Sequence, residues 1–251
     1  MTLTIAADCH LADDPSLSMG LDTQANFNAC AARIRELVPD HVVLLGDYSF
    51  DTPRRRDLEW LAGRMTLTGA PYSAVAGNHD APADVAAVLM REELLIGSRL
   101  YYRRDFGRVR CLFLDTSPGD VDAAQLAWVR QEIAGATGQV IAFMHHPPAR
   151  TGVAFMDREH ALRGAEVGGP VYAALFGGRR PVTVFCGHHH SARSLHIGPH
   201  TVHVCPSTAY QIDPVGEAFR VAHAMPALRH VEVADGEVRT WVEVLPGEKR
   251  P

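Results

Sequence analysis

Short apolar runs separated by polar segments recur through the first two thirds of the chain. Their length and their content of Val, Ile, Leu and Phe are typical of strands buried within a sheet. The clearest runs are LTIAA, HVVLLG, YSAVAG, QVIAFM and VTVFCG, at residues 3–7, 41–46, 72–77, 139–144 and 182–187. We therefore expect a sheet core built from these segments.

Helical patterns lie between these runs. Apolar side chains recur at helical spacing in residues 22–38 and again in residues 56–67. Pro82 is placed to open a third helix, and Asp122 with Gln125 predicts a capping box for a helix that ends near residue 134. The resulting order of strands and helices is typical of an α/β fold, in which ligands bind beyond the carboxyl ends of the strands.

Paired strands are expected in the second half of the chain. Tight turns predict hairpins within residues 100–115, 192–205 and 230–244. Residues 147–169 are rich in Pro, Gly and Arg and read as an irregular stretch, followed by a short helix near 170–177. We expect one domain over residues 1–251, with helices outside stacked sheets and the strands of about 192–244 in the second sheet.

Composition narrows the class of protein. The chain has 47% hydrophobic and 21% charged residues, which is ordinary for a globular fold, and its net charge of -5 argues against nucleic acid as the main partner. Five cysteines without CxxC spacing indicate a reduced protein, and neither a signal peptide nor a membrane-spanning run is evident. We therefore expect a cytoplasmic protein with no membrane partner.

Potential metal ligands follow five of the predicted strands. The side chains are Asp8 and His10, Asp47, Asn78 and His79, His145 and His146, and His188 and His190. Taken singly, each has an ordinary structural role such as a turn, a helix cap or a buried hydrogen-bonded histidine. Five polar clusters in equivalent positions favour one shared site.

The types of ligand indicate which metals suit this site. In extended backbone, residues two apart point the same way, so Asp8 with His10 and His188 with His190 form two arms. Mixed oxygen and imidazole ligands suit Mn, Fe or Zn better than Mg or Ca. Seven ligands are too many for one ion and suit two, with Asp47 as the natural bridging carboxylate.

These motifs resemble those of the calcineurin-like metallophosphoesterases, which carry DxH, GD, GNH[DE], H and GHxH in that order. The motifs here span residues 8–190. The resemblance implies a four-layer α/β/β/α sandwich, with two mixed sheets flanked by helices. It also implies two divalent ions, the first held by Asp8, His10, Asp47 and His190, and the second by Asp47, Asn78, His145 and His188.

A narrower resemblance concerns the substrate. Residues 113–129, 145–157 and 205–214 look like the class III cyclic-nucleotide phosphodiesterase branch, which includes glycerophosphodiesterases. The chain departs from protein phosphatases, because Asp51 lies four residues after Asp47, one too far for their GDxxD motif, and no role is carried over to it. The chain is also short for this branch, so a separate cap is expected to be absent or reduced.

What the resemblance implies is a phosphodiesterase that hydrolyses a small organic phosphodiester, either a cyclic nucleotide or a glycerophosphodiester. A hydroxide bridging the two ions would attack in line, and His79 would protonate the leaving alkoxide. Asn78 would ligate metal and donate to the phosphate. His146 is expected either to contact substrate or to hydrogen-bond behind the ligands. Asp80 would orient His79 or, as we prefer, start the helix at Pro82.

Several alternatives stay open at this point. A phosphomonoesterase with a broad substrate range would use the same ligands. A non-catalytic metal-binding scaffold is disfavoured, because such a protein would be expected to lose ligands or the His79 imidazole. The ligand types suit Mn, Fe and Zn equally, so they do not identify the metal. The loop with Met156 and Asp157 is expected to line the pocket. The oligomeric state stays open, and pairing of the C-terminal hairpin strands across a homodimer is one option.

Overall fold

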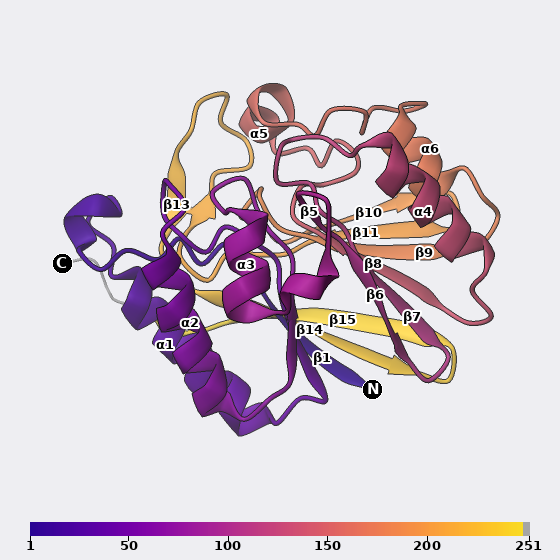
Figure 1. Cartoon of the computed structure of the whole chain (residues 1–251). Coiled ribbons are helices and arrows are strands. Elements are labelled where there is room, and N and C mark those ends of the chain that lie inside the picture. The colour runs from indigo at the N-terminus through magenta and orange to yellow at the C-terminus, as the bar shows by residue number, and fades with distance from the viewer. Residues whose placement is uncertain (248–251) are drawn as a thin grey trace.

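The computed structural model describes residues 1–247 and contains two large sheets (Figure 1). The first sheet has the order β15 (Glu237–Val244), β14 (Ala227–Ala234), β1 (Thr2–Ala6), β2 (His41–Leu44) and β3 (Tyr72–Ala74). Strands β1, β2 and β3 run parallel, whereas β14 is antiparallel to both β1 and β15. The carboxyl ends of the three parallel strands therefore lie at the same edge of the sheet.

The second sheet is also mixed. Its order is β10 (Arg193–Ile197), β11 (His200–Val204), β9 (Val182–Cys186), β8 (Val140–Met144), β7 (Val109–Phe113) and β6 (Tyr102–Phe106). The four central strands are parallel, and β10 and β6 are antiparallel strands at the two edges. The five predicted core strands all form.

Helices cover the outer face of each sheet. The first sheet carries α1 (Thr23–Leu37), α2 (Arg55–Thr68) and α3 (Pro82–Leu89). The second carries α4 (Ala123–Ala134) and α6 (Pro170–Phe176). In Figure 1 the two helix groups lie on opposite sides of the sheets. This is the four-layer α/β/β/α sandwich that the resemblance implied.

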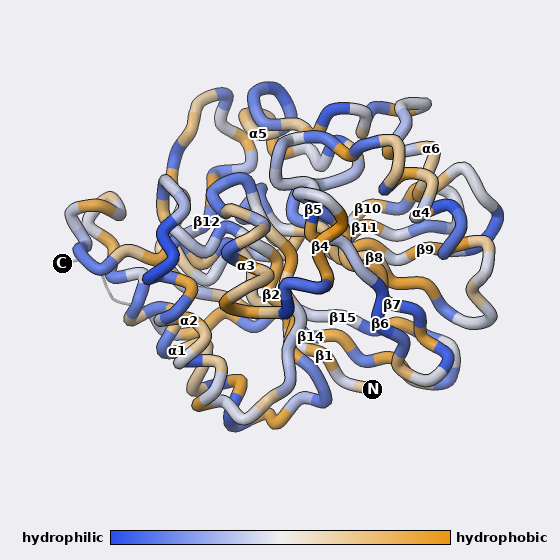
Figure 2. The backbone as a smooth tube through the Cα atoms, viewed as in Figure 1, coloured by the Kyte–Doolittle hydropathy of each residue, from blue (hydrophilic) through white to orange (hydrophobic). Residues whose placement is uncertain are grey.

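Successive side chains of the central strands point to opposite faces of the sheet, and each face packs into a different hydrophobic core. In β8, Ile141 and Phe143 point into the core that joins the sheets, whereas Val140, Ala142 and Met144 point to the core beneath α4 and α6. Because both faces of this strand are buried, its residues are apolar without interruption. Figure 2 shows the result as hydrophobic colouring along the central strands and hydrophilic colouring on outer loops.

A row of rings crosses the second sheet between the layers. Tyr102, Phe113, Phe143, Phe185 and His203 occupy paired positions on five strands, and successive ring centroids lie 4.6, 5.1, 5.7 and 5.1 Å apart. The Tyr102 hydroxyl donates to the carbonyl oxygen of residue 74 in β3 at 2.8 Å. This bond ties the second sheet to the first beside the loop that carries the Asn78 motif.

The last hairpin joins a different sheet from the one expected. Strands β10 and β11 belong to the second sheet, but β14 and β15 belong to the first, where Leu3 pairs with Val231. The free edge of β1 accepts β14, and Leu228 and Val231 then complete the core between the sheets. The placement of residues 227–244 in the second sheet was therefore wrong.

The polar residues at the start of α4 form hydrogen bonds that differ in part from the predicted capping box. Asp122 accepts the backbone N–H of Gln125 at 2.8 Å, as the capping box requires. The Gln125 amide instead bonds the backbone N and O of Asp115, at 2.8 and 2.9 Å, so only half of the box forms. The Asp115 carboxylate accepts from Ser117 N and Leu100 N, so it stabilises the turn that follows β7.

The smaller elements lie around the strand ends. The predicted irregular stretch contains α5 (Ala154–Glu159), and a short ladder pairs β12 (Gln211–Ile212) with β13 (Val221–His223). A second short ladder joins β4 (Leu95–Ile96) to β5 (Arg99–Leu100). Within residues 1–247, no helix has the length and apolar character needed to cross a bilayer. The single-domain organisation and the homodimer stay predictions.

Candidate metal centre

The strand-end motifs of both sheets meet in one place. Asp8 N donates to Gly46 O at 3.1 Å, and His188 N donates across the sheets to Asp8 Oδ1 at 2.8 Å. Overlapping groups of donor atoms, each within 4.8 Å, contain Asp8, His10, Asp47, His79, His145, His146, His188 and His190. Asn78 joins them through its Oδ1 atom, which lies 3.1 Å from His145 Nε2. All the expected ligands are thus brought together.

The backbone at these motifs is unusual. Five residues of the expected ligand set have positive φ angles between 41° and 65°, namely Asp8, His10, Asp47, His188 and His190. Positive φ is uncommon outside glycine, and it persists at functional sites only where surrounding structure enforces it. The fold therefore holds these side chains in place at a conformational cost.

The proton positions on two rings follow from backbone carbonyls. His10 Nδ1 lies 3.1 Å from Phe50 O, and His190 Nδ1 lies 2.9 Å from Tyr210 O. Because a carbonyl oxygen only accepts, each Nδ1 carries the proton and each Nε2 keeps its lone pair. These two Nε2 atoms nevertheless face each other at 3.0 Å. Neither neutral ring has a proton to place between them, which favours a cation there.

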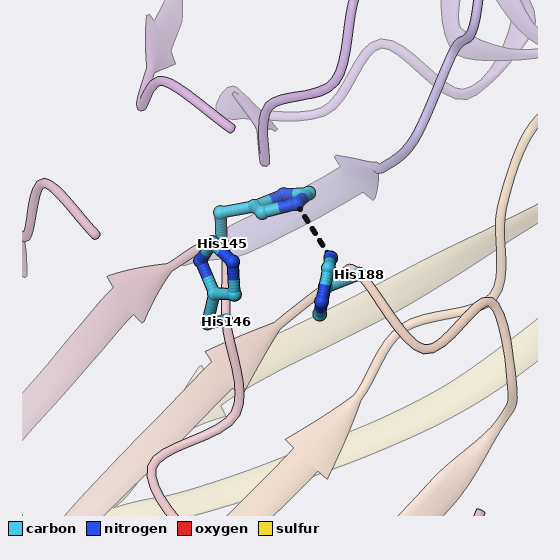
Figure 3. A group of neighbouring side chains, drawn as sticks. All are labelled: His145, His146 and His188. Atoms are coloured by element: carbon cyan, nitrogen blue, oxygen red, sulfur yellow. Dashed lines mark hydrogen bonds between the residues drawn. The ribbon is translucent and has the colours of Figure 1, made fainter. Parts of the chain in front are cut away.

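A second pair of rings repeats this arrangement. His145 Nδ1 donates to Leu45 O at 2.8 Å, and His188 Nε2 donates to His160 O at 3.0 Å. The remaining nitrogens, His145 Nε2 and His188 Nδ1, face each other at 3.2 Å, as the dashed line in Figure 3 shows. Asn78 Oδ1 approaches the same His145 nitrogen. With His145 in its neutral form, both ring pairs therefore offer lone pairs to the same centre.

Asp47 lies between the two ring pairs. Its Oδ2 atom is 3.2 Å from His145 Nε2 and 3.7 Å from His10 Nε2. Asp8 Oδ2 is buried and has no hydrogen-bond partner among the residues that the structure describes. Buried acceptors of this kind need a positive partner. The nitrogen and oxygen donors therefore fit two divalent cations, with Asp47 shared between them.

Charge and burial act against each other in this centre. Burial alone would lower the pKa of His145, but the carboxylates of Asp47 and Asp8 outweigh it and raise that pKa to about 9. Burial and the neighbouring His190 lower the pKa of His10 to about 4. Burial opposes ionisation of Asp47, yet its histidine neighbours hold its pKa well below the usual range. At neutral pH, His145 is therefore protonated, and its positive charge balances the nearby carboxylates.

Asp80 has a different role from either one expected. Its Oδ2 accepts from Asp47 N at 2.7 Å and Gly77 N at 2.8 Å, and its Oδ1 accepts from Tyr48 N at 2.9 Å. The cap position of α3 is residue 81, which makes no side-chain cap bond. Asp80 therefore joins the loops after β2 and β3. A Cβ atom at Gly77 would overlap Asp47 Oδ1, so this close approach requires glycine.

His79 lies at the edge of the centre and is less buried than the aspartate and histidine ligands. Its backbone N donates to Asp47 Oδ1 at 2.9 Å, and its Nδ1 lies 2.6 Å from the backbone oxygen of Asp51. The carbonyl assigns the proton to Nδ1, so Nε2 faces Asp47, whose Oδ2 is 3.9 Å away. Asp51 thus acts through its backbone, and its side chain is exposed.

His146 does not reach the opening that the ligands border. Its side chain is buried, its Nδ1 lies 3.0 Å from Thr116 Oγ1, and its ring centroid is 4.2 Å from that of His188. Figure 3 shows it beside the His145 and His188 rings. His146 packs against His188 and is not among the residues that line the cavity, so its position favours a hydrogen bond behind the ligands over substrate contact.

A cavity of about 260 Å³ opens over the centre. One side is lined by His10, Asp47, Asn78, His79, His188 and His190, and the opposite side by Phe155, Met156, His160, Tyr210, Ile212 and Phe219. Met156 lines it as expected, but Asp157 faces away and accepts from Thr151 N at 2.9 Å. Sequence reasoning missed Phe155 and Phe219, whose irregular segments carry no periodic signal.

The fold and the convergent donor atoms define a metal-binding α/β/β/α sandwich with its centre at the strand ends. The family described as calcineurin-like phosphoesterase matches residues 1–192, so the chain belongs to that family. A relative from Fibrobacter succinogenes, named "Probable cyclic nucleotide phosphodiesterase", is 31% identical over 94% of this chain and 91% of its own length. A "Glycerophosphodiester phosphodiesterase GpdQ" from Enterobacter lignolyticus is 28% identical, over 78% of this chain and 73% of its own.

Solved structures with the same fold are more distant in sequence. A dimetal phosphatase from Danio rerio has a TM-score of 0.67 at 15% identity, over 96% of this chain and 98% of its own. A purple acid phosphatase from yellow lupin has a TM-score of 0.68 at 12% identity, over 96% of this chain and 53% of its own. At such identities the likeness shows the fold alone.

The role of Asp80 is tested by Asp80→Asn. The amide nitrogen cannot accept, so at least one of the backbone N–H groups of Asp47, Gly77 or Tyr48 loses its partner. We expect a loss of about 1–3 kcal/mol in the free energy of unfolding, together with weaker metal binding. Denaturant unfolding and metal analysis measure both. The half-exposed Asp84→Asn in α3 is the matched control, and unchanged stability and metal content in Asp80→Asn would contradict the assignment.

Metal binding should release a proton from His145. The pKa of about 9 means that this ring is protonated in the metal-free protein at pH 7, whereas a metal ligand must be neutral. Between pH 7 and 8.5 we expect affinity to rise about tenfold per pH unit, and to level off above pH 9. Calorimetry in buffers of different ionisation enthalpy counts the proton. A pH-independent affinity with no proton release would show that His145 binds no metal.

Proposed function

We propose that this chain is a phosphoric diester hydrolase that uses two divalent cations to cleave a small organic phosphodiester. The observation that carries this proposal is the convergence of buried lone pairs around Asp47, with His79 beside them at the cavity. The names of the relatives from Fibrobacter and Enterobacter support a cyclic nucleotide or a glycerophosphodiester as substrate. Mn, Fe and Zn are the metals that the ligand set suits.

The expected ligands divide between two positions. Asp8, His10, Asp47 and His190 would hold the first cation, and Asp47, Asn78, His145 and His188 the second. Two bound cations supply a nucleophilic water at neutral pH and neutralise charge on the phosphate. The protein's share is to hold its ligands at the required spacing, which the carbonyl-bound imidazoles accomplish.

His79 is positioned to protonate the leaving group. Expulsion of an alkoxide needs a proton donor within reach, and an imidazole titrates near neutral pH. The Asp51 carbonyl fixes the ring through Nδ1 and leaves Nε2 toward the cavity. Asn78 turns Oδ1 toward His145, so its amide N–H groups are available to a phosphate oxygen. Both residues come from the loop after β3.

A scaffold without activity fits these features less well. Such a protein has no need of a cavity bordered by five of the seven expected ligands and a separate, oriented imidazole. The reducing compartment expected from the sequence agrees with five buried, free cysteines, and we propose a cytoplasmic location on that ground. The choice between diester and monoester is an outcome of the experiment that follows.

Metal-depleted protein should be inactive, and reconstitution with Mn, Fe or Zn should restore hydrolysis of bis(p-nitrophenyl) phosphate. We expect a higher kcat/KM on this diester than on p-nitrophenyl phosphate, measured by release of p-nitrophenolate. Asp47→Asn should abolish activity, because it removes the ligand shared by both positions. A faster monoester reaction would instead identify a phosphomonoesterase. No turnover with about two ions bound per chain would identify a scaffold.

His79→Asn should reveal the proton donor. With a diester whose leaving group is an alkyl alcohol, we expect kcat to fall by about 10²–10⁴, because the alkoxide needs a proton. With p-nitrophenolate, which is stable as an anion, the loss should be much smaller. Metal content should not change, and His196→Asn on the exposed face of β10 is the control. Equal losses on both substrates would assign His79 to binding rather than proton transfer.

A further inference from the structure

The cavity wall opposite the ligands is largely aromatic and aliphatic. Phe155 comes from α5, and Tyr210 and Phe219 come from the segment around β12. Tyr210 is buried and Phe155 is half-buried, but 44% of Phe219 is exposed. A large apolar side chain that borders a ligand cavity and still faces solvent is positioned to contact whatever fills the cavity.

The three rings form a cluster through edge-to-face contacts. The Phe155 and Phe219 centroids lie 6.2 Å apart at 63°, and those of Tyr210 and Phe219 lie 6.3 Å apart at 86°. These are edge-to-face contacts, so the rings support one another while their faces are not stacked together. A flat group of the substrate can therefore stack on a face without displacing a neighbour.

This wall offers little to a polyhydroxylated group. Among the described residues that line the cavity, Asp47 carries the one carboxylate and no lysine or arginine is present. The polar side-chain groups of the wall are the His160 imidazole and the Tyr210 hydroxyl, and the remaining wall side chains are apolar. A glycerol moiety that enters the cavity would lose its hydrogen bonds to water and regain few from this wall. An aromatic ring has few such hydrogen bonds to lose.

The two segments that carry the rings are fastened to each other. Arg158 Nη2 donates to Glu217 O at 2.5 Å, and the backbone N of residue 154 donates to Pro214 O at 3.3 Å. In Figure 1, α5 and the loop before β13 stand together beyond the strand ends. The aromatic cluster is thus held in place before substrate binds, which reduces the entropy lost on stacking.

We propose that Phe155 and Phe219 are specificity-determining residues that bind an aromatic ring of the substrate, so that a phosphodiester bearing a nucleobase is preferred to one bearing glycerol. The proposal rests on the phosphodiesterase function proposed above. The phosphate lies over the ligands, and the ring stacks on the cavity side of Phe155 and Phe219. Stacking on such rings tolerates different bases, because every base presents a flat face.

The experiment isolates the base. Metal-loaded protein is given adenosine 3′,5′-cyclic phosphate and the corresponding cyclic phosphate of 1-deoxyribose, which lacks the base, with glycerophosphocholine as a third substrate. We expect kcat/KM to favour the base-bearing compound by about tenfold or more. Phe155→Ala and Phe219→Ala should each reduce that preference by about tenfold, mainly through KM, and leave the abasic compound within about twofold. Phe219→Tyr should retain the preference.

Trp241→Ala is the matched control, since Trp241 is an exposed aromatic residue on β15 outside the cavity. It should leave the preference unchanged. Equal kcat/KM values for the base-bearing and abasic compounds in the unaltered protein, or a preference untouched by both phenylalanine variants, would overturn the proposed ring site while leaving the phosphodiesterase function intact. Failure to hydrolyse any of the three diesters or bis(p-nitrophenyl) phosphate would overturn the phosphodiesterase function itself.

Discussion

The structure depends on a hydrogen bond between each ligand imidazole and a backbone carbonyl. Phe50, Tyr210, Leu45 and His160 supply the carbonyls, and each fixes which ring nitrogen keeps its lone pair. The remaining ring nitrogens then converge on Asp47, and at neutral pH the added proton of His145 lies among them. Such a cluster is electrostatically unfavourable unless positive charge enters it. The main chain thereby determines that this site binds cations.

The two sheets make this convergence possible. The carbonyls and ligands come from loops of both sheets, so a small slip between the layers would separate them. The ring row across the second sheet, with the Tyr102 hydroxyl bonded to β3, opposes such a slip. Asp80 fixes the loops after β2 and β3 to each other, and Asp8 does the same between β1 and β9. Positive φ angles at the ligands are sustained by these connections.

The sequence predicted the parts of the site that follow directly from strand ends. Apolar runs located the strands, and the ligands came immediately after them. It did not predict the contacts of Asp80 with the other loop, because Asp47 and Tyr48 lie 33 and 32 residues away. It misplaced β14 and β15, because an alternating hairpin fits the edge of either sheet. It left His146 between two roles and missed the aromatic wall for a related reason: the directions of loop side chains depend on tertiary packing.

The two groups of cavity-lining residues serve different needs, metal binding and substrate selection. The ligand side is rigid, buried and polar, since cations bind well only where donors are fixed in advance. The wall side is apolar and partly exposed, and it comes from short segments outside the main sheets. His79 lies between them, oriented by the neutral Asp51 carbonyl, which adds no further charge beside Asp47. Changes in the wall can therefore alter which alcohol is accepted without moving the ligands or the proton donor, and this independence allows one metal centre to serve different phosphodiesters.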